Sequence, residues 1–207
     1  MDFKILVSVL PSVILLIAAV INSYKIIKQQ VQPALSTWLI ILAAALMSFV
    51  TYLSAEQNAF LSGLLNFGDV LSTALVSVVI IFFSQINIKL KSFEKYYLLG
   101  LILVAAFWFL SSDPFVSNLL IQLLLSIGYA PTIHHLIKSK RNTESFLVWG
   151  LILAASLISL YPAIIALTEH GIILSLIYSV RAIILLSITI ILMKYYSYFD
   201  NKPVTNF

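Results

Sequence analysis

Two side chains of opposite charge stand out because each lies near the middle of a long apolar segment. Asp69 lies within residues 60–83, and Arg181 lies within residues 171–194. An unpaired charge at that depth of a bilayer costs about 2.5–3.5 kcal/mol on insertion scales. The two charges therefore favour an ion pair. It is either a permanent salt bridge that holds two parts of the protein together, or a pair that gates a cavity or binds a charged or zwitterionic solute. The remaining alternative is that they do not pair.

Polar side chains recur at steps of three or four residues in the same segments and in one other. Such spacing places them on one face of each helix. Inside a membrane, a polar face is expected to point toward the interior of a helix bundle or a water-filled cavity. The three sets are Ser62, Asn66, Asp69, Thr73 and Ser77; Ser175, Tyr178, Arg181 and Thr189; and Asn118, Gln122 and Ser126.

Catalytic and metal-binding signatures are missing from the sequence. There is no Cys, which excludes thiolate ligands and cysteine nucleophiles. No HExxH, GxSxG or phosphate-binding Gly-rich loop is found. His134 and His135 are adjacent, so their side chains diverge by about 100° on a helix and no third ligand lies nearby. We therefore predict that the protein is not an enzyme and uses no cofactor or metal.

The elements that position these residues follow from composition. Of 207 residues, 61% are hydrophobic and only 10% are charged, and the mean hydropathy is +1.07. These values exclude an ordinary soluble enzyme, a disordered chain and a nucleic-acid-binding protein. Most of the apolar stretches are long enough to cross about 30 Å of hydrocarbon as helices, so we predict an all-α integral membrane protein with seven spans. The stretches are roughly 5–23, 34–54, 60–83, 96–111, 115–137, 145–164 and 171–194.

Basic residues predict the orientation of the spans. Ten of the twelve Lys and Arg residues follow the first, third, fifth and seventh stretches. By the positive-inside rule, the N-terminus is then outside and the C-terminus is in the cytoplasm. Short loops, the absence of Cys and the lack of an organellar targeting segment favour a prokaryotic plasma (inner) membrane.

An internal repeat predicts the arrangement of the spans. With an offset of about 110 residues, the first three spans align with the last three, so that Asn66 matches Tyr178 and Asp69 matches Arg181. Both triplets run in the same direction, so a linker span must join them. We expect two parallel three-helix bundles in a 3+1+3 plan. Residues 1–88 form the first bundle, 89–113 the cytoplasmic loop and linker helix, and 114–207 the second bundle and a short tail.

One stretch resembles a known motif. Residues 128–145, which begin Gly128-Tyr-Ala-Pro-Thr and continue through a basic loop to Ser145, resemble the PQ-loop motif, with Thr132 in place of its Gln. That family includes the SWEET sugar transporters, nicotinamide-riboside transporters, lysosomal amino-acid exporters and the KDEL receptor. The resemblance implies the 3+1+3 plan and a transport function. SWEET proteins place an Asn on each third helix, and Asn66 and Tyr178 occupy those positions here.

These observations lead to one leading function and two alternatives. We predict a facilitator or proton-coupled carrier of a small polar metabolite that works by alternating access in the lipid bilayer, with no nucleic-acid partner and with a homo-oligomer possible. The alternatives are a non-transporting membrane receptor and an accessory or structural membrane protein with a structural Asp-Arg pair. Pro131 is the predicted hinge of the fifth span. The predicted cavity residues are Asn66, Asp69 and Thr73, with Tyr178 and Arg181 opposite, and Gln122 and Asn118 in an outer vestibule.

Overall fold

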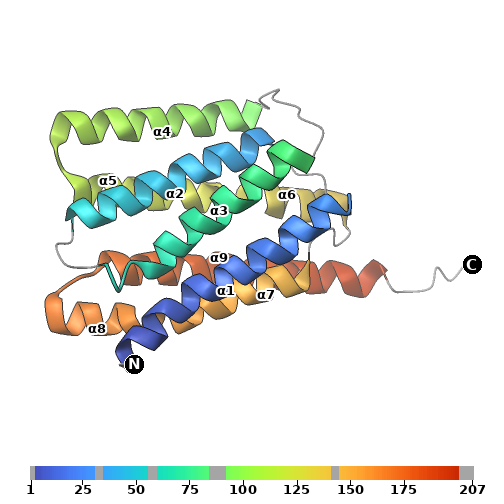
Figure 1. Cartoon of the computed structure of the whole chain (residues 1–207). Helices are drawn as coiled ribbons and strands as arrows, with labels where there is room; N and C mark the ends of the chain where they lie inside the picture. Colours follow the sequence, from blue (N-terminus) through green and yellow to red (C-terminus); the bar gives the residue numbers. More distant parts are fainter. Residues whose placement is uncertain (1–2, 31–34, 56–59, 84–91, 141–144, 201–207) are drawn as a thin grey trace, which may run out of the picture.

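The computed structural model is helical apart from turns and short connections in the residues that it describes, which are 3–30, 35–55, 60–83, 92–140 and 145–200. Figure 1 shows the helices along the chain. They are α1 (Phe3–Ile27), α2 (Leu35–Ala55), α3 (Leu64–Phe83), α4 (Ser92–Ser111), α5 (Pro114–Ile127), α6 (Ala130–Ser139), α7 (Phe146–Ile158), α8 (Leu160–His170) and α9 (Leu174–Asp200).

Within the described residues, seven helical segments are long and apolar enough to cross a membrane. Five of them come from single helices, while Pro114–Lys138 combines α5 with most of α6, and Phe146–His170 combines α7 with α8. The predicted class, a multi-pass all-α membrane protein with seven spans, is confirmed at this level. Helices are required because the bilayer core offers no water to the backbone, so each amide must bond within its own segment.

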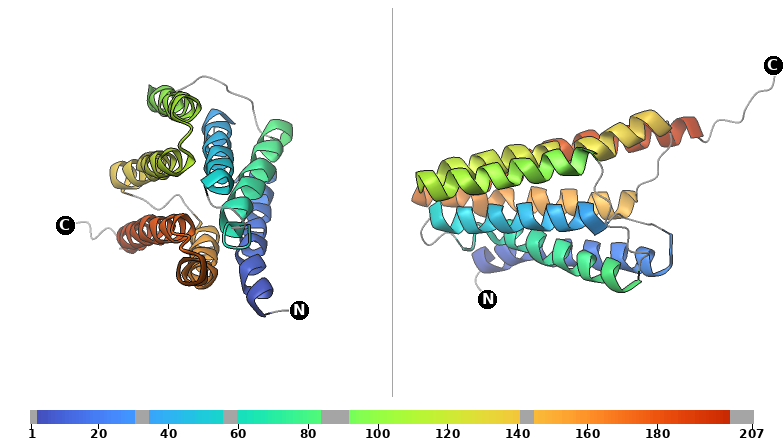
Figure 2. Two further views of the ribbon diagram at one scale, coloured as in Figure 1. Left: turned by 90° about the vertical axis from the view of Figure 1, so that its left-hand side faces the viewer. Right: turned by 90° about the horizontal axis from the view of Figure 1, so that it is seen from above.

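Six of the spans form a closed ring. In the end-on view of Figure 2, the order around the ring is α1, α3, α2, the fifth span (α5 and α6), α9 and the sixth span (α7 and α8). Each neighbour in this order is in contact with the next, and α7 closes the ring against α1. Helix α4 lies outside the ring against α5 and α2. The side chains that face the centre of this ring therefore come from segments far apart in sequence.

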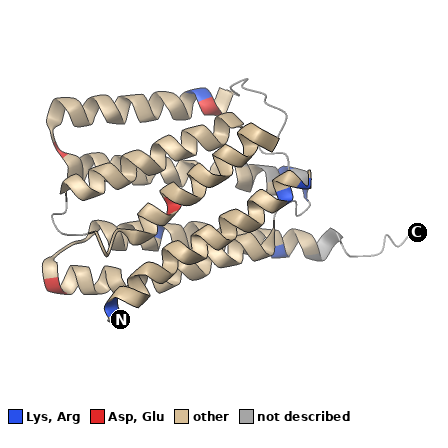
Figure 3. Cartoon of the chain, viewed as in Figure 1, with Lys and Arg blue, Asp and Glu red and all other residues tan. Residues whose placement is uncertain are grey.

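The two ends of the bundle differ in charge. We call the end that holds Phe3 and the α2–α3, α4–α5 and α8–α9 connections the N-terminal face, and the opposite end the C-terminal face (Figure 1). Figure 3 shows basic residues mainly toward the C-terminal face. Described Lys residues near that face are Lys25, Lys28, Lys95, Lys138, Lys140 and Lys194. Lys89, Lys91, Arg141, Lys202 and the predicted boundary between residues 88 and 89 lie outside the described residues.

The fifth span is interrupted near Pro131. Helix α5 begins at the N-cap Asp113, whose carboxylate accepts a 3.0 Å hydrogen bond from Val116 N. It ends at Ile127, and α6 begins at Ala130. Proline has no N–H, so Pro131 cannot bond to the carbonyl of Ile127 four residues earlier. The sequence therefore locates this break correctly, and whether it acts as a hinge stays a prediction.

A second break, which the sequence analysis did not single out, divides the sixth span. Helix α7 ends at Ile158 and α8 begins at Leu160, with Ser159 between them. Pro162 lies four residues after Ile158 and removes the same kind of backbone bond. The Ser159 hydroxyl donates to Ser156 O at 2.7 Å and bonds to the hydroxyl of Ser179 at 2.8 Å. The second break is thus tied to α9.

The fourth span is longer than predicted and begins with a buried carboxylate. Its helix starts at Ser92 rather than near residue 96, which places Glu94 in the first turn with only 3% of its surface exposed. The Glu94 carboxylate accepts hydrogen bonds from the hydroxyls of Ser36, at 2.9 Å, and Thr37. Most of α4 is otherwise exposed, as expected for a helix on the outside of the ring. Glu94 anchors its C-terminal-face end to the start of α2.

Candidate functional site

Asp69 and Arg181 come together inside the ring, but through a third residue. The hydroxyl of Tyr178 donates a hydrogen bond to Oδ2 of Asp69. The guanidinium of Arg181 lies over the ring of Tyr178, 4.7 Å from its centroid. No salt bridge forms between Asp69 and Arg181 in the structure. The direct ion pair expected from the sequence is therefore replaced by a chain of three side chains, in which Tyr178 contacts both charges.

Helix geometry explains this arrangement. Tyr178 and Arg181 are three residues apart on α9, so they lie on the same face about 4.5 Å apart along the axis. Asp69 lies on α3, across the ring from α9. The phenol of Tyr178 spans this gap and satisfies one oxygen of the carboxylate. The ring face gives Arg181 a favourable but weaker partner than a carboxylate.

A second polar cluster joins α2, α3 and α5. Ser48 of α2 is fully buried, and its hydroxyl accepts hydrogen bonds from the amides of Asn66 at 3.0 Å and Gln122 at 2.9 Å. Asn118 donates to Ser48 O at 2.8 Å and to the Thr51 hydroxyl at 2.9 Å, and its own carbonyl accepts from Gln122 at 3.2 Å. The side chain of Asn118 is thus fully engaged. We call Ser48, Thr51, Asn66, Asn118 and Gln122 the amide cluster.

Several buried polar atoms near these two clusters have no hydrogen-bond partner. In the amide cluster they are the side-chain carbonyl oxygens of Asn66 and Gln122. On α9 they are the hydroxyl of Ser175 and Nε of Arg181. A buried polar group without a partner costs about 1–3 kcal/mol, so such groups are rare unless water or a ligand satisfies them. Their concentration at the centre of the ring marks it as the candidate site.

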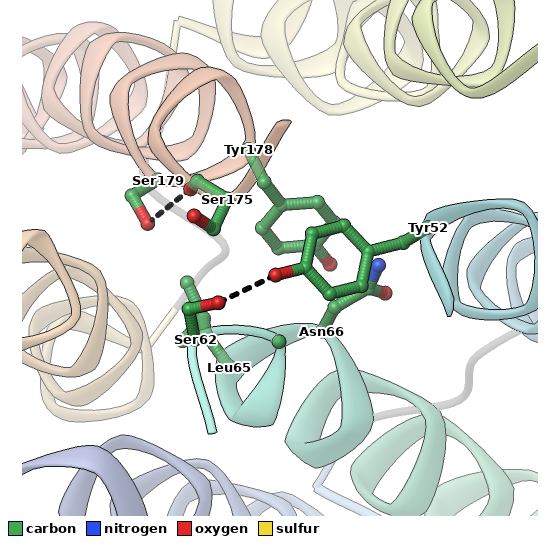
Figure 4. Close-up of a pocket in the computed structure, with 8 residues that line it drawn as sticks. Tyr52, Ser62, Leu65, Asn66, Ser175, Tyr178 and Ser179 are labelled. Atoms are coloured by element: carbon green, nitrogen blue, oxygen red, sulfur yellow. Dashed lines mark hydrogen bonds between the residues drawn. The ribbon is translucent and has the colours of Figure 1, made fainter. Parts of the chain in front are cut away.

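A small cavity opens between α2, α3 and α9. Figure 4 shows the rings of Tyr52 and Tyr178 approaching each other from opposite helices above Asn66. The cavity has room for about one water molecule. The hydroxyl of Tyr52 bonds to that of Ser62 at 2.6 Å beside it. The cavity is lined by Tyr52, Ser62, Gly63, Leu65, Asn66, Ser175, Tyr178 and Ser179. In this conformation it does not hold a metabolite.

Two tyrosines toward the C-terminal face lie within range of the charge of Arg181. These are Tyr97 of α4 and Tyr129, which lies at the break in the fifth span. The hydroxyl of Tyr97 is buried without a hydrogen-bond partner and lies against Gly128, where an added Cβ would sit 3.2 Å from it. The ring of Tyr129 packs edge-on against Trp149. The break at Gly128 thus lets a phenol reach the interior of the bundle.

The structure distributes the predicted site residues unevenly. Asn66, Asp69, Tyr178 and Arg181 meet as described above. Thr73 is buried and its hydroxyl donates to Asp69 O at 2.7 Å, and its contribution to a ligand site stays a prediction. Asn118 and Gln122 are buried in the amide cluster, at 1% and 4% exposure, where an open vestibule was expected. The side chain of Pro131 lies outside the described part of the structure.

Four contributors were not predicted. Ser48, Tyr52 and Thr51 lie on α2, which shows no polar stripe as clear as that of α3, and Tyr97 lies on the span expected to face lipid. The available signal for Tyr52 was its alignment with Tyr161 in the repeat. For Tyr97, the signal was a phenol next to Tyr96 and three residues after Glu94, at a polar helix start. Among the described residues, no group of three His, Asp or Glu is placed to hold a metal ion.

The chain was compared with protein-family models, curated proteins and solved structures, and none of the three comparisons gave a match. The functional argument therefore depends on the fold and the site themselves.

Proposed function

We propose that the protein is a membrane transporter for a small polar solute, and that the solute binds at the centre of the ring beside Asp69, Tyr178 and Arg181. The observation that carries the proposal is the guanidinium of Arg181, which lies inside the bundle with its buried Nε unpartnered and a tyrosine ring as its neighbour. Placing a charged side chain inside a bilayer costs free energy. A cation that lies there without a carboxylate partner is therefore typical of a functional site.

The packing of the ring supports alternating access. In each triplet the third helix lies between the first two, since α3 contacts α1 and α2, and α9 contacts the fifth and sixth spans. The triplets then meet through α1 with α7 and through α2 with α5. If the first triplet is superposed on the second, α1 takes the place of the fifth span and α2 that of the sixth span. The contact between α1 and α7 then corresponds to the contact between α5 and α2. Such symmetry fits the proposed 3+1+3 plan, in which two similar halves rock about a central site.

Orientation and membrane are part of the same proposal. Six described Lys residues lie near the C-terminal face, where Lys25 donates a 2.6 Å hydrogen bond to Ser145. Near the N-terminal face, Lys4 pairs with Glu169 at 3.0 Å. We place the C-terminal face in the cytoplasm because cytoplasmic loops carry the excess of Lys and Arg. The Lys25–Ser145 and Lys4–Glu169 contacts lie at opposite ends of the interface between α1 and the sixth span. We propose that the central site opens to the two sides of the membrane in turn along this interface.

A screen for stabilising ligands is the first test. The purified protein is heated with sugars, amino acids, nucleosides and vitamins, next to a D69N/R181Q variant and a K194Q control, whose lost cation lies on the same helix but is exposed. A ligand that binds only the folded state raises the melting temperature by mass action. We expect one solute class to stabilise the wild type and K194Q but not D69N/R181Q. The same solute should then enter proteoliposomes saturably.

A static function has one specific observation in its favour. Both ends of the Asn118 side-chain amide in the amide cluster are hydrogen-bonded, and the neighbouring cavity holds only about one water molecule. If no solute stabilises the wild type, and D69N/R181Q melts far below it, the three side chains hold the bundle together and the receptor or structural alternative is correct. If solutes bind but none crosses proteoliposomes, the protein is a receptor.

A further inference from the structure

The buried groups without hydrogen-bond partners in and around the ring include both acceptors and donors. Asn66 and Gln122 each leave a buried carbonyl oxygen free, and these are acceptors. Arg181 leaves Nε–H free inside the ring, and Tyr97 of α4, which packs against α2 and α5 from outside the ring, leaves a buried hydroxyl free; both can donate. A ligand that satisfies all of them must carry N–H or O–H donors at one end and an acceptor, best an anion, at the other.

The free groups of Asn66 and Arg181 also lie on opposite sides of the Asp69–Tyr178 hydrogen bond along the bundle axis. Asn66 precedes Asp69 by three residues on α3, which places it about 4.5 Å nearer the N-terminal face. Arg181 follows Tyr178 by the same distance on α9, toward the C-terminal face. Tyr97 belongs to the first turns of α4, which starts at that face. Asn66 and the free hydroxyl of Ser175, which can accept or donate, therefore lie toward the N-terminal face, and the donors of Arg181 and Tyr97 lie toward the C-terminal face.

Charge narrows the ligand further. When Asp69 is ionised, it and Arg181 carry one charge of each sign, so the site is neutral as a whole. A ligand with a net charge would leave one of the two uncompensated inside the membrane, which is strongly unfavourable. A zwitterion leaves both paired: its ammonium meets Asp69 and the carbonyl oxygens, and its carboxylate meets the guanidinium, which binds carboxylates through two parallel hydrogen bonds.

Tyr178 occupies part of this arrangement in the present structure. Its hydroxyl donates to Asp69, as a ligand ammonium would, and its ring holds the guanidinium of Arg181, as a ligand carboxylate would. Both contacts are weaker than the ionic ones that would replace them. The cavity beside the ring holds about one water molecule, so a ligand can enter only if the side chain moves.

We propose that the ligand is a small zwitterion with a primary or secondary ammonium and a carboxylate, and that Tyr178 is an internal stand-in which the ligand displaces from Asp69 and Arg181. The proposal rests on the proposed function in placing the ligand inside the ring. It adds the class of ligand, its direction in the site and the residue that competes with it. Binding of the carboxylate draws Arg181 from the ring of Tyr178, which frees the phenol to leave Asp69.

The test measures binding to the purified full chain by thermal shift and calorimetry. The probes are the twenty common amino acids, each tested singly. For the best of them, three relatives follow: the N-acetyl form, which has lost the ammonium; the methyl ester, which has lost the carboxylate; and the N-trimethyl form, which keeps both charges but has no N–H. We expect the parent amino acid to bind and each relative to bind at least about tenfold more weakly, as loss of a hydrogen bond to a charged group predicts.

The Y178F variant tests the stand-in. Phenylalanine keeps the ring under Arg181 and removes only the hydroxyl that competes for Asp69. We expect the amino acid to bind about tenfold more tightly to Y178F than to the wild type. The Y24F control removes a phenol from an exposed tyrosine of α1 and should bind as the wild type does.

Four outcomes decide the proposal. Tighter binding by Y178F together with loss of binding by the three relatives supports it. Weaker or unchanged binding by Y178F, in a variant that melts cooperatively, overturns the stand-in. If no amino acid binds either protein while another solute enters proteoliposomes in an Arg181-dependent manner, the ligand class is wrong and the transport proposal stands. If an amino acid binds as expected but never crosses the membrane, the transport proposal fails and the zwitterion site stands.

Discussion

Asn118 of the amide cluster and Arg181 of the Asp69–Tyr178–Arg181 chain lie in the same ring interior but differ in how completely their polar groups are used. Asn118 makes hydrogen bonds through both ends of its side-chain amide, and it lies between α2 and α5 with 1% of its surface exposed. Arg181 has a fixed charge, an unpartnered buried Nε and an aromatic ring as its neighbour. A ligand that bonds to a side chain whose hydrogen bonds are all made must break one of them. A ligand that bonds to a side chain with an unused donor or acceptor adds a hydrogen bond. Polarity inside a membrane protein therefore does not by itself identify a site; unused bonding capacity does.

The largest expected effect on solute binding is that of Arg181→Gln. Solute binding or uptake should fall about a hundredfold, the equivalent of the ~3 kcal/mol that a hydrogen bond to a charged group can contribute. The melting temperature in the absence of solute should not fall, since the lost side chain has few strong partners. Uptake in proteoliposomes and thermal melting measure the two effects. A variant that melts far below wild type would place Arg181 with the structural cluster.

Asn118→Leu should produce the opposite result. The substitution removes two donated hydrogen bonds and leaves Thr51 and the Gln122 amide with fewer partners. We expect the free energy of unfolding to fall by about 2 kcal/mol, measured by equilibrium unfolding in mixed micelles. Solute affinity, corrected to the folded fraction, should change less than in Arg181→Gln. If affinity is lost and stability is kept, Asn118 belongs to the binding site.

Tyr97→Phe examines the donor side of the chain. Its hydroxyl is buried without a hydrogen-bond partner, so removing it should leave stability unchanged or raise it by about 1 kcal/mol. Solute affinity should fall about fivefold, the equivalent of ~1 kcal/mol for one lost hydrogen bond. Isothermal calorimetry of the variant and of the exposed control Tyr24→Phe gives the comparison. Unchanged affinity would confine the site to α3, α5 and α9.

The smallest effect on stability is expected outside the ring interior. Lys4 and Glu169 pair near the N-terminal face with about half of each side chain exposed, at 55% and 48%. An exposed pair of this kind contributes about 0.2–1 kcal/mol and is weakened by salt. Lys4→Gln should therefore lower the melting temperature slightly at low salt and not at high salt. A salt-independent loss would show that Lys4 has a structural function beyond this pair.

The sequence predicted the spans well because hydropathy and length are local properties. It also placed the break near Pro131, since a missing N–H acts on its own helix. The sixth span shows the limit: Pro162 carries the same signal, but its break at Ser159 was not singled out.

The site was only partly predictable. Asp69 and Arg181 were identified because charges in apolar segments are rare. The predicted direct ion pair is absent because the side chain of Tyr178 lies between the two and contacts both. Ser48 could not have been chosen from the sequence. A serine in an apolar helix is common, and it becomes the centre of the amide cluster only because α3 and α5 both pack against α2.

The closed ring has a consequence for biogenesis. When α1, α2 and α3 have entered the bilayer, they can already pack together, because their contacts need no later segment. Some of their polar side chains still lack partners at that stage. The hydrogen bond from Gln122 to Ser48 requires the fifth span, and the hydrogen bond from Tyr178 to Asp69 requires the seventh. During that interval the carboxylate of Asp69 on α3 lacks its partner inside the bilayer, whereas the amide of Asn66 can already bond to Ser48 of α2. The nascent chain thus carries an intermediate that is exposed to quality-control proteases until its last helix closes the ring.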